Sequence, residues 1–198
     1  MTESFSDLFA ETIKENEEFF KTNETRKKFL NEVVELANDS IDLIPKSTDM
    51  SNPRLAFWLH ALQPLSYGIY TSLISGNILT CFMQLRLLLE YLALNSMAEK
   101  ISGDNLLEKY IIARNDYEKS ISKLLRDFDI EALELWQRLS KWLHARTYSE
   151  RIELTTINEG TKLWSVIQPA FYSKEDEVEL EELYQSISQF RKILKKHV

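Results

Sequence analysis

The segment from Gly76 to Leu94 reads GNILTCFMQLRLLLEYLAL and carries the clearest structural signal in the chain. Glycine and asparagine punctuate the chain, and a nearly continuous apolar run follows, which predicts a buried helix from Ile78 to about Ile101. Arg86 and Glu90 are the charged residues of the quoted segment. They are four apart, so on a helix they lie about 40° from each other on one face. The segment therefore predicts a central helix with one Arg–Glu pair.

This charged pair leaves two interpretations open. Burying it is costly unless both groups are paired and hydrogen-bonded, so it either fixes the register of a buried helix or lines a polar pocket. The pair and Gln84 interrupt the apolar run, whereas a membrane span needs about 20 residues with few or no charges. We therefore expect a core helix of a soluble protein. Residues 1–7 lack the basic-then-apolar order of a signal peptide, so we expect a cytoplasmic protein.

Composition narrows the fold and the partners. The 198 residues suffice for one well-buried core, and we expect a single helical domain over residues 1–198. Glycine and proline number only four each, which disfavours the many tight turns of β-proteins. The net charge of −7 argues against general binding of DNA or anionic membranes. The basic clusters at 26–28 and 191–196 are short, and we interpret them as solvated helix faces. The single cysteine, Cys81, excludes an internal disulfide.

Apolar residues at spacings of three and four predict further helices on both sides of the central one. They include a helix over 53–75 with a kink near Pro64, one long helix over 106–128, and a helix over 130–146 capped by Asp129. Residues 152–167 are instead rich in β-branched and aromatic residues around a turn, which favours a hairpin or extended segment. The expected fold is all-α, a bundle of about six helices with one small extended segment.

A second polar signal lies in LSKWLHAR, residues 139–146. On the predicted helix, Trp136, Ser140 and His144 follow one another at intervals of four and share a broad stripe that faces the bundle. We interpret Trp136 as core packing. A lone histidine on such a stripe is either a satisfied core residue or a group for proton transfer near neutral pH.

If the two helices pack together, Arg86, Glu90 and His144 converge. Glu90 then orients the imidazole or raises its pKa, and Arg86 receives an anion. Other catalytic patterns are missing from the sequence: a glycine-rich phosphate loop, paired cysteines for zinc and a nucleophile elbow. The chain has three histidines, no two of them at ligand spacing on one helix. We therefore expect no metal site and no cofactor.

Read together, these segments resemble a broad group of uncharacterised prokaryotic helical domains. The pattern is a glycine, an apolar helix with Arg-x-x-x-Glu, and a later helix with Leu-Ser-x-x-x-His; its positions here are Gly76, Arg86, Glu90, Leu139, Ser140 and His144. That group looks related to the HEPN superfamily of helical bundles. Many HEPN proteins are toxins or RNA-targeting effectors that act as dimers. The resemblance covers about residues 55–150.

The resemblance implies metal-independent RNA cleavage by an Arg…His motif with four to six intervening residues. Arg138 and His144 have five residues between them. Leu139 stands where the family usually has a polar residue. On a continuous helix Arg138 also points about 120° away from His144, so the two side chains cooperate only across a dimer or at a helix break.

Two functions stay open at this point. In the first, a HEPN-like domain cleaves or targets RNA at a specific site, with His144 as general acid and base and Arg138 or Arg86 stabilising phosphate charge. In the second, a non-catalytic bundle binds a protein partner or a small ligand, and Arg86, Glu90 and His144 form a structural network. A homodimer is compatible with both functions, and the amphipathic first helix and the last helix each offer it an apolar face.

Overall fold

The computed structural model describes residues 5–46, 49, 51–103, 105–117, 120–143 and 171–198. Every regular element in these ranges is helical and they contain no strand, which confirms the predicted all-α class. The extended segment predicted at 152–167 lies outside the described residues. The helices that are described already outnumber the six expected, because two of the predicted helices are divided.

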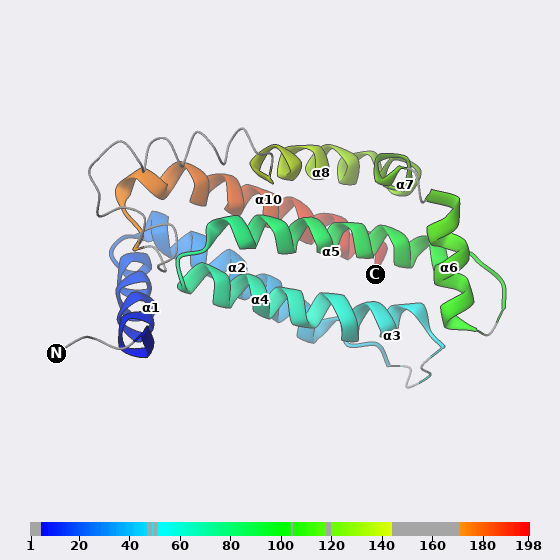
Figure 1. The fold of residues 1–198 in the computed structure, drawn as a ribbon, viewed down its shortest axis with the longest axis horizontal. Helices are drawn as coiled ribbons and strands as arrows, with labels where there is room; N and C mark the ends of the chain where they lie inside the picture. Colours follow the sequence, from blue (N-terminus) through cyan, green and yellow to red (C-terminus); the bar gives the residue numbers. More distant parts are fainter. Residues whose placement is uncertain (1–4, 47–48, 50, 104, 118–119, 144–170) are drawn as a thin grey trace.

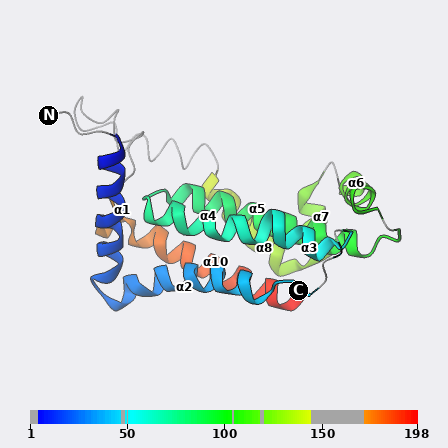
Figure 2. The ribbon, with the colours of Figure 1, turned by 90° about the horizontal axis from the view of Figure 1, so that it is seen from below.

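The helices form two layers, with α5 (Ile78–Glu99) in the middle of the first (Figures 1 and 2). On its two sides α5 is flanked by α4 (Gln63–Ile74) and α8 (Ile130–Leu143). The second layer consists of α2 (Glu24–Asp42), which packs on α4, and α10 (Glu177–His197), which packs on α5 and α8. The second layer therefore covers one face of the central helix.

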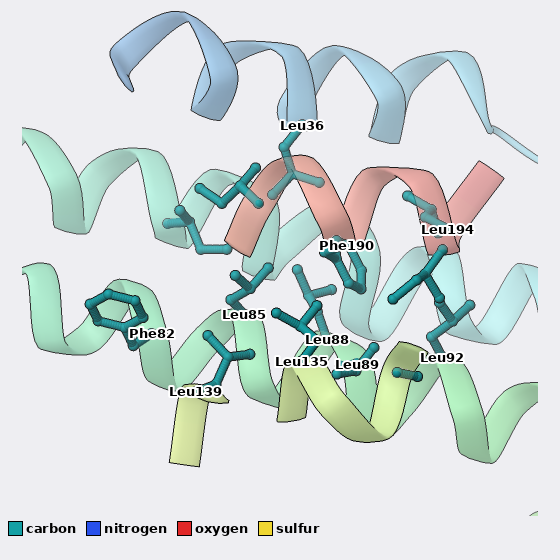
Figure 3. Packing of buried hydrophobic residues seen from close by; sticks show 14 of the residues in the cluster. Leu36, Phe82, Leu85, Leu88, Leu89, Leu92, Leu135, Leu139, Phe190 and Leu194 are labelled. Carbon is teal, nitrogen blue, oxygen red and sulfur yellow. The ribbon is translucent and has the colours of Figure 1, made fainter. Parts of the chain in front are cut away.

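The hydrophobic core lies between the layers (Figure 3). Leu85, Leu88 and Leu89 of α5 are fully buried. Figure 3 shows them packed with side chains of α8 and α10, among them Leu135, Leu139, Phe190 and Leu194. Burying one such leucine contributes about 2 kcal/mol, so the apolar run of α5 supplies much of the driving force for assembly.

The bounds of α5 agree with the prediction to within two residues. Asn77 caps the helix, since its side chain accepts a hydrogen bond from the Thr80 amide at 3.1 Å. Gly76 has a φ of 78°, a left-handed conformation that favours glycine. In the described part of the chain, α5 alone is long and apolar enough to cross a membrane by length and composition. Half of its most apolar stretch is buried within the bundle.

The predicted helix over 53–75 has an irregular middle. It consists of α3 (Pro53–Phe57), a π-helical turn (Trp58–Leu62) and α4. The irregularity was predicted near Pro64 and lies just before it. Pro64 stands in the first turn of α4, where a proline is tolerated because its missing amide would have had no intrahelical partner.

The prediction of one continuous helix over 106–128 is wrong. The chain forms α6 (Leu106–Tyr117) and α7 (Ile121–Phe128) instead, with α6 lying across one end of the bundle (Figure 1). Ser120 begins α7, because its side chain accepts a hydrogen bond from the Lys123 amide at 3.2 Å. The apolar spacing continues across Ser120, so the spacing alone does not show that this serine caps a new helix.

At the opposite end, α1 (Phe5–Lys21) stands across the bundle (Figures 1 and 2). Asn16 of α1 donates a hydrogen bond to the Ile74 carbonyl at 3.1 Å and accepts one from the Tyr172 amide at 2.9 Å. The Tyr172 hydroxyl donates to the Leu73 carbonyl at 2.7 Å. These bonds join three segments that are far apart in the sequence.

Ion pairs stabilise the contact between α2 and α10. Arg191, whose side chain is 15% exposed, contacts Glu32 at 2.9 Å, Glu35 at 3.3 Å and also Asp39. Burial alone would raise the pKa of Asp39, but hydrogen bonds from Arg191 and Lys195 outweigh it and lower the pKa. The interpretation of the 191–196 cluster as a solvated face is therefore wrong for Arg191, which joins two helices.

Asp129 joins the end of α10 to the start of α8. One carboxylate oxygen accepts the Glu131 amide at 2.8 Å, which confirms the predicted cap of α8. The other oxygen lies 2.8 Å from Lys196 Nζ and 2.8 Å from His197 Nε2. The ring centroid of His197 is also 4.2 Å from that of Phe128. This cluster anchors the last turn of α10.

Candidate functional site

The Arg–Glu pair of α5 lies on the side of that helix that packs against α8. Arg86 Nε donates a hydrogen bond to Glu90 Oε1 at 2.9 Å, and the two side chains are 30% and 21% exposed. Their expected position on one face is confirmed. The pair is therefore neither sealed inside the apolar core nor fully exposed to solvent.

Trp136 of α8 completes the pair into a cluster of three residues. Its indole Nε1 donates to Glu90 Oε1 at 2.6 Å, and the centre of the Arg86 guanidinium lies 4.6 Å from its ring centroid. The first contact is a charge-assisted hydrogen bond and the second is a cation–π contact. We call Arg86, Glu90 and Trp136 the seam cluster.

Trp136 packs against the core, as predicted, but it is only partly buried and it also has a polar role that the sequence did not predict. The sequence signal that pointed to this role was its place in the stripe of Ser140 and His144. The sequence did not predict the register in which α8 packs on α5. That register is antiparallel, since Phe82 stacks on Trp142 with centroids 5.1 Å apart, whereas Glu90 meets Trp136.

The geometry of the seam cluster leaves Arg86 able to bind an anion. Glu90 and Trp136 fix the plane of the guanidinium through Nε and the ring face. In the described ranges, no hydrogen-bond partner is found for its Nη1 and Nη2 atoms. A planar guanidinium with two open N–H edges matches the oxygens of a phosphate or carboxylate, and its rigidity lowers the entropy lost on binding.

Ser140 and His144 follow Trp136 along the same stripe. Ser140 is buried, and its hydroxyl donates to the Trp136 carbonyl one turn earlier, at 2.7 Å. In this position it supports the helix rather than the seam cluster. His144 lies outside the described residues, which reach Leu143 in α8. The expected convergence of His144 with Arg86 and Glu90 therefore stays a prediction.

Arg138, the other candidate arginine, contacts α10. Its Nε lies 2.8 Å from Glu182 Oε1, in an orientation that makes an ion pair without a hydrogen bond from Nε. Its Nη2 donates to Ser186 Oγ at 3.3 Å. The structure thus brings Arg86, Glu90 and Trp136 together, and it gives Arg138 partners on a different helix.

Two hollows of about 350 and 500 Å³ lie away from the seam cluster. The smaller is beside Phe57, Trp58 and Val198, and the larger is beside Phe19, Phe171 and Tyr172. In the part of the chain that the structure describes, no group of three or more His, Cys, Asp or Glu side chains is arranged to hold a metal ion. Cys81 is free and fully buried, and burial raises the pKa of its thiol well above the ordinary value.

The chain matches no model of a protein family, no curated protein and no solved structure. The seam cluster is therefore interpreted from its own geometry and from the resemblance described above.

Proposed function

We propose that this chain is a HEPN-like helical domain that acts on RNA, with Arg86 as the residue that binds a phosphate. The observation that carries the proposal is the guanidinium of Arg86, which Glu90 and Trp136 hold in place, while neither Nη atom has a hydrogen-bond partner among the described residues. A phosphate oxygen placed there would receive two parallel N–H donors.

The partners of Arg138 favour Arg86 over Arg138 for this role. Arg138 already pairs with Glu182 and donates to Ser186, so recruiting it would break contacts between α8 and α10. His144 follows directly on the described part of α8, the helix that supplies Trp136. We assign His144 the proton transfers and Arg86 the stabilisation of negative charge on the phosphate.

The negative net charge of the chain limits how it can bind RNA. With a net charge of −7, the chain does not bind nucleic acid through many phosphate contacts. One or two phosphates at a specific position fit a single fixed arginine. Binding should therefore weaken only modestly with salt, because the salt dependence scales with the number of phosphates neutralised.

The test is RNA cleavage by the purified chain with a chelator present. Wild type is compared with His144→Ala and Arg86→Gln, and with Arg126→Gln as a matched control that removes one exposed positive charge on α7. We expect cleavage to resist the chelator, to disappear in the first two variants and to persist in the control. Thermal melting of each variant separates loss of activity from loss of fold. Cleavage that survives both site substitutions contradicts the proposal.

A non-catalytic binding module is the second candidate, and the contacts of Arg138 favour it. An arginine that ties α8 to α10 is unavailable to the Arg…His motif that the resemblance implies. If wild type cleaves none of a varied set of RNAs, and His144→Ala only lowers the melting temperature, the seam cluster is architecture. Fluorescence anisotropy with labelled RNA then shows whether binding remains without cleavage.

A further inference from the structure

The smaller of the two hollows, of about 350 Å³, lies where the end of α2, the start of the 53–75 segment and the end of α10 meet. Figure 2 shows α2 and α10 finishing at the same end of the bundle. The volume is within the range of small-molecule sites, about 300–1,000 Å³. Of the ten described residues that line the hollow, seven are apolar and three are charged. Mostly apolar walls with a few charged groups are typical of such sites.

The π-helical turn, Trp58–Leu62, shapes one wall of the hollow. The Gln63 amide donates to the Trp58 carbonyl five residues earlier, which closes a wider turn than in an α-helix. Residues five apart lie about 140° from each other on an α-helix, and the wider turn brings them closer to one side. Phe57 and Leu62 therefore both line the hollow. Turns of this kind are frequent at functional sites.

Trp58 gives the hollow a fixed aromatic wall. Its indole Nε1 donates a hydrogen bond to the Ser40 carbonyl at 2.6 Å, which holds the ring against α2. Phe57, which precedes it in the sequence, is buried and supplies a second ring. Because both side chains are already fixed, a ligand that binds between them orders few further groups. This wall suits a flat aromatic body.

Two cations and one carboxylate border the hollow. Lys46 is exposed, and its ammonium pairs with no carboxylate in the described ranges. Arg54 is held by Glu99, 2.9 Å from its Nε, and by the Val198 carbonyl, 3.1 Å from its Nη1. For Arg54 Nη2 the described residues offer no hydrogen-bond partner. Asp42 is the carboxylate, so the lining groups carry one more positive than negative charge, which favours a ligand with a single anionic group.

We propose that this hollow binds a small aromatic carboxylate. The aromatic body lies against Phe57 and Trp58. At the border, the carboxylate accepts hydrogen bonds from Lys46 Nζ and Arg54 Nη2. No residue of the seam cluster lines the hollow, so this is a second site and it does not rest on the proposed function.

An NMR titration with 2-naphthoate tests the proposal. The signal of the Trp58 indole N–H, which Trp58→Phe identifies among those of the four tryptophans, should shift as the ligand is added. The uncharged 2-naphthamide should bind at least about 5-fold more weakly, because it lacks the charge that the two border cations attract. A signal that stays unchanged at millimolar 2-naphthoate overturns the proposal, and so does equal binding of the amide.

Charge substitutions test the sign of the ligand. Lys46→Gln should weaken the binding of 2-naphthoate about 3-fold, and Asp42→Asn should strengthen it by a similar factor, since both side chains are exposed to solvent. Lys14→Gln is the matched control, because Lys14 is an exposed lysine of α1 that does not line the hollow. Effects of the opposite sign, or equal affinities of Lys46→Gln and Lys14→Gln, contradict an anionic ligand at this border.

Ile44→Trp tests the location. Ile44 lines the hollow and is 50% exposed, so a larger side chain there should fill the hollow without unfolding the chain, and binding should be lost. Ile41→Trp, at a site that is 48% exposed and outside the hollow, should bind like wild type. Thermal melting checks that both variants are folded. Equal affinities of the two variants overturn the proposed site. None of these measurements involves RNA, so this inference and the proposed function fail separately.

Discussion

Replacing Asp129 by asparagine should remove a charge interaction while keeping the cap of α8. Asparagine caps helices as well as aspartate does, so the bond from the Glu131 amide is retained. What disappears is the negative charge that Lys196 and His197 contact, each at 2.8 Å. The substitution therefore isolates the electrostatic part of the link between α8 and the end of α10.

The size of the effect follows from the pKa of Asp129. Burial would raise that pKa, but hydrogen bonds from His197, Lys196 and the Glu131 amide outweigh burial and lower it from 3.8 to about 2. Each pH unit of difference between the folded and unfolded pKa is worth about 1.4 kcal/mol, so the charge stabilises the fold by roughly 2 kcal/mol at neutral pH. The Asp129 side chain is 3% exposed, so solvent screening reduces this value little.

The stabilisation by Asp129 is lost at low pH, because the pKa of this residue is lower in the folded chain than in the unfolded chain. Between about pH 4 and pH 2 the unfolded chain binds the proton first, so the contribution is complete above pH 4 and disappears as the pH falls toward 2. Urea unfolding at pH 7 should show Asp129→Asn about 2 kcal/mol less stable than wild type. At pH 3 the difference should be about half as large.

Asp127→Asn is the control for this measurement. Asp127 is an exposed carboxylate two residues away, and its replacement should change the free energy of unfolding by no more than about 0.5 kcal/mol. If Asp129→Asn is as stable as wild type at pH 7, or if its deficit is the same at pH 7 and pH 3, the electrostatic account of the cluster is wrong.

Two further substitutions test the core and the seam cluster. Leu88→Ala should lower the free energy of unfolding by about 3–5 kcal/mol, because it leaves a cavity at a fully buried position. Leu107→Ala, at a site that is 67% exposed, should lower it by less than about 1 kcal/mol. Chemical denaturation measures both changes, and similar losses for the two variants would contradict the two-layer core. Trp136→Phe removes the indole donor to Glu90 and should cost about 1–2 kcal/mol. In a double-mutant cycle with Glu90→Ala, which removes the acceptor, a coupling energy near zero would show that this hydrogen bond contributes nothing.

The sequence by itself determined the features that depend on neighbours within about four residues. The all-α class, the bounds of α5, the cap at Asp129 and the pairing of Arg86 with Glu90 were all predictable. Helix formation, capping and i,i+4 contacts use groups that are close along the chain, so the local pattern of residues suffices to predict them. The division of 106–128 into α6 and α7 shows the limit of this approach, because an apolar stripe alone does not reveal where a helix changes direction.

Only the tertiary structure decided which distant residues meet. Glu90 and Trp136 are 46 residues apart, and Arg191 contacts Glu32 across 159 residues. Such pairs depend on the register between helices and on the order of the layers, and a helical stripe specifies neither. The same holds for Met83, Leu87 and Tyr91 of α5: they were visible in the sequence as apolar residues, but their exposure among the described residues follows from a second layer that packs on only one side of the helix.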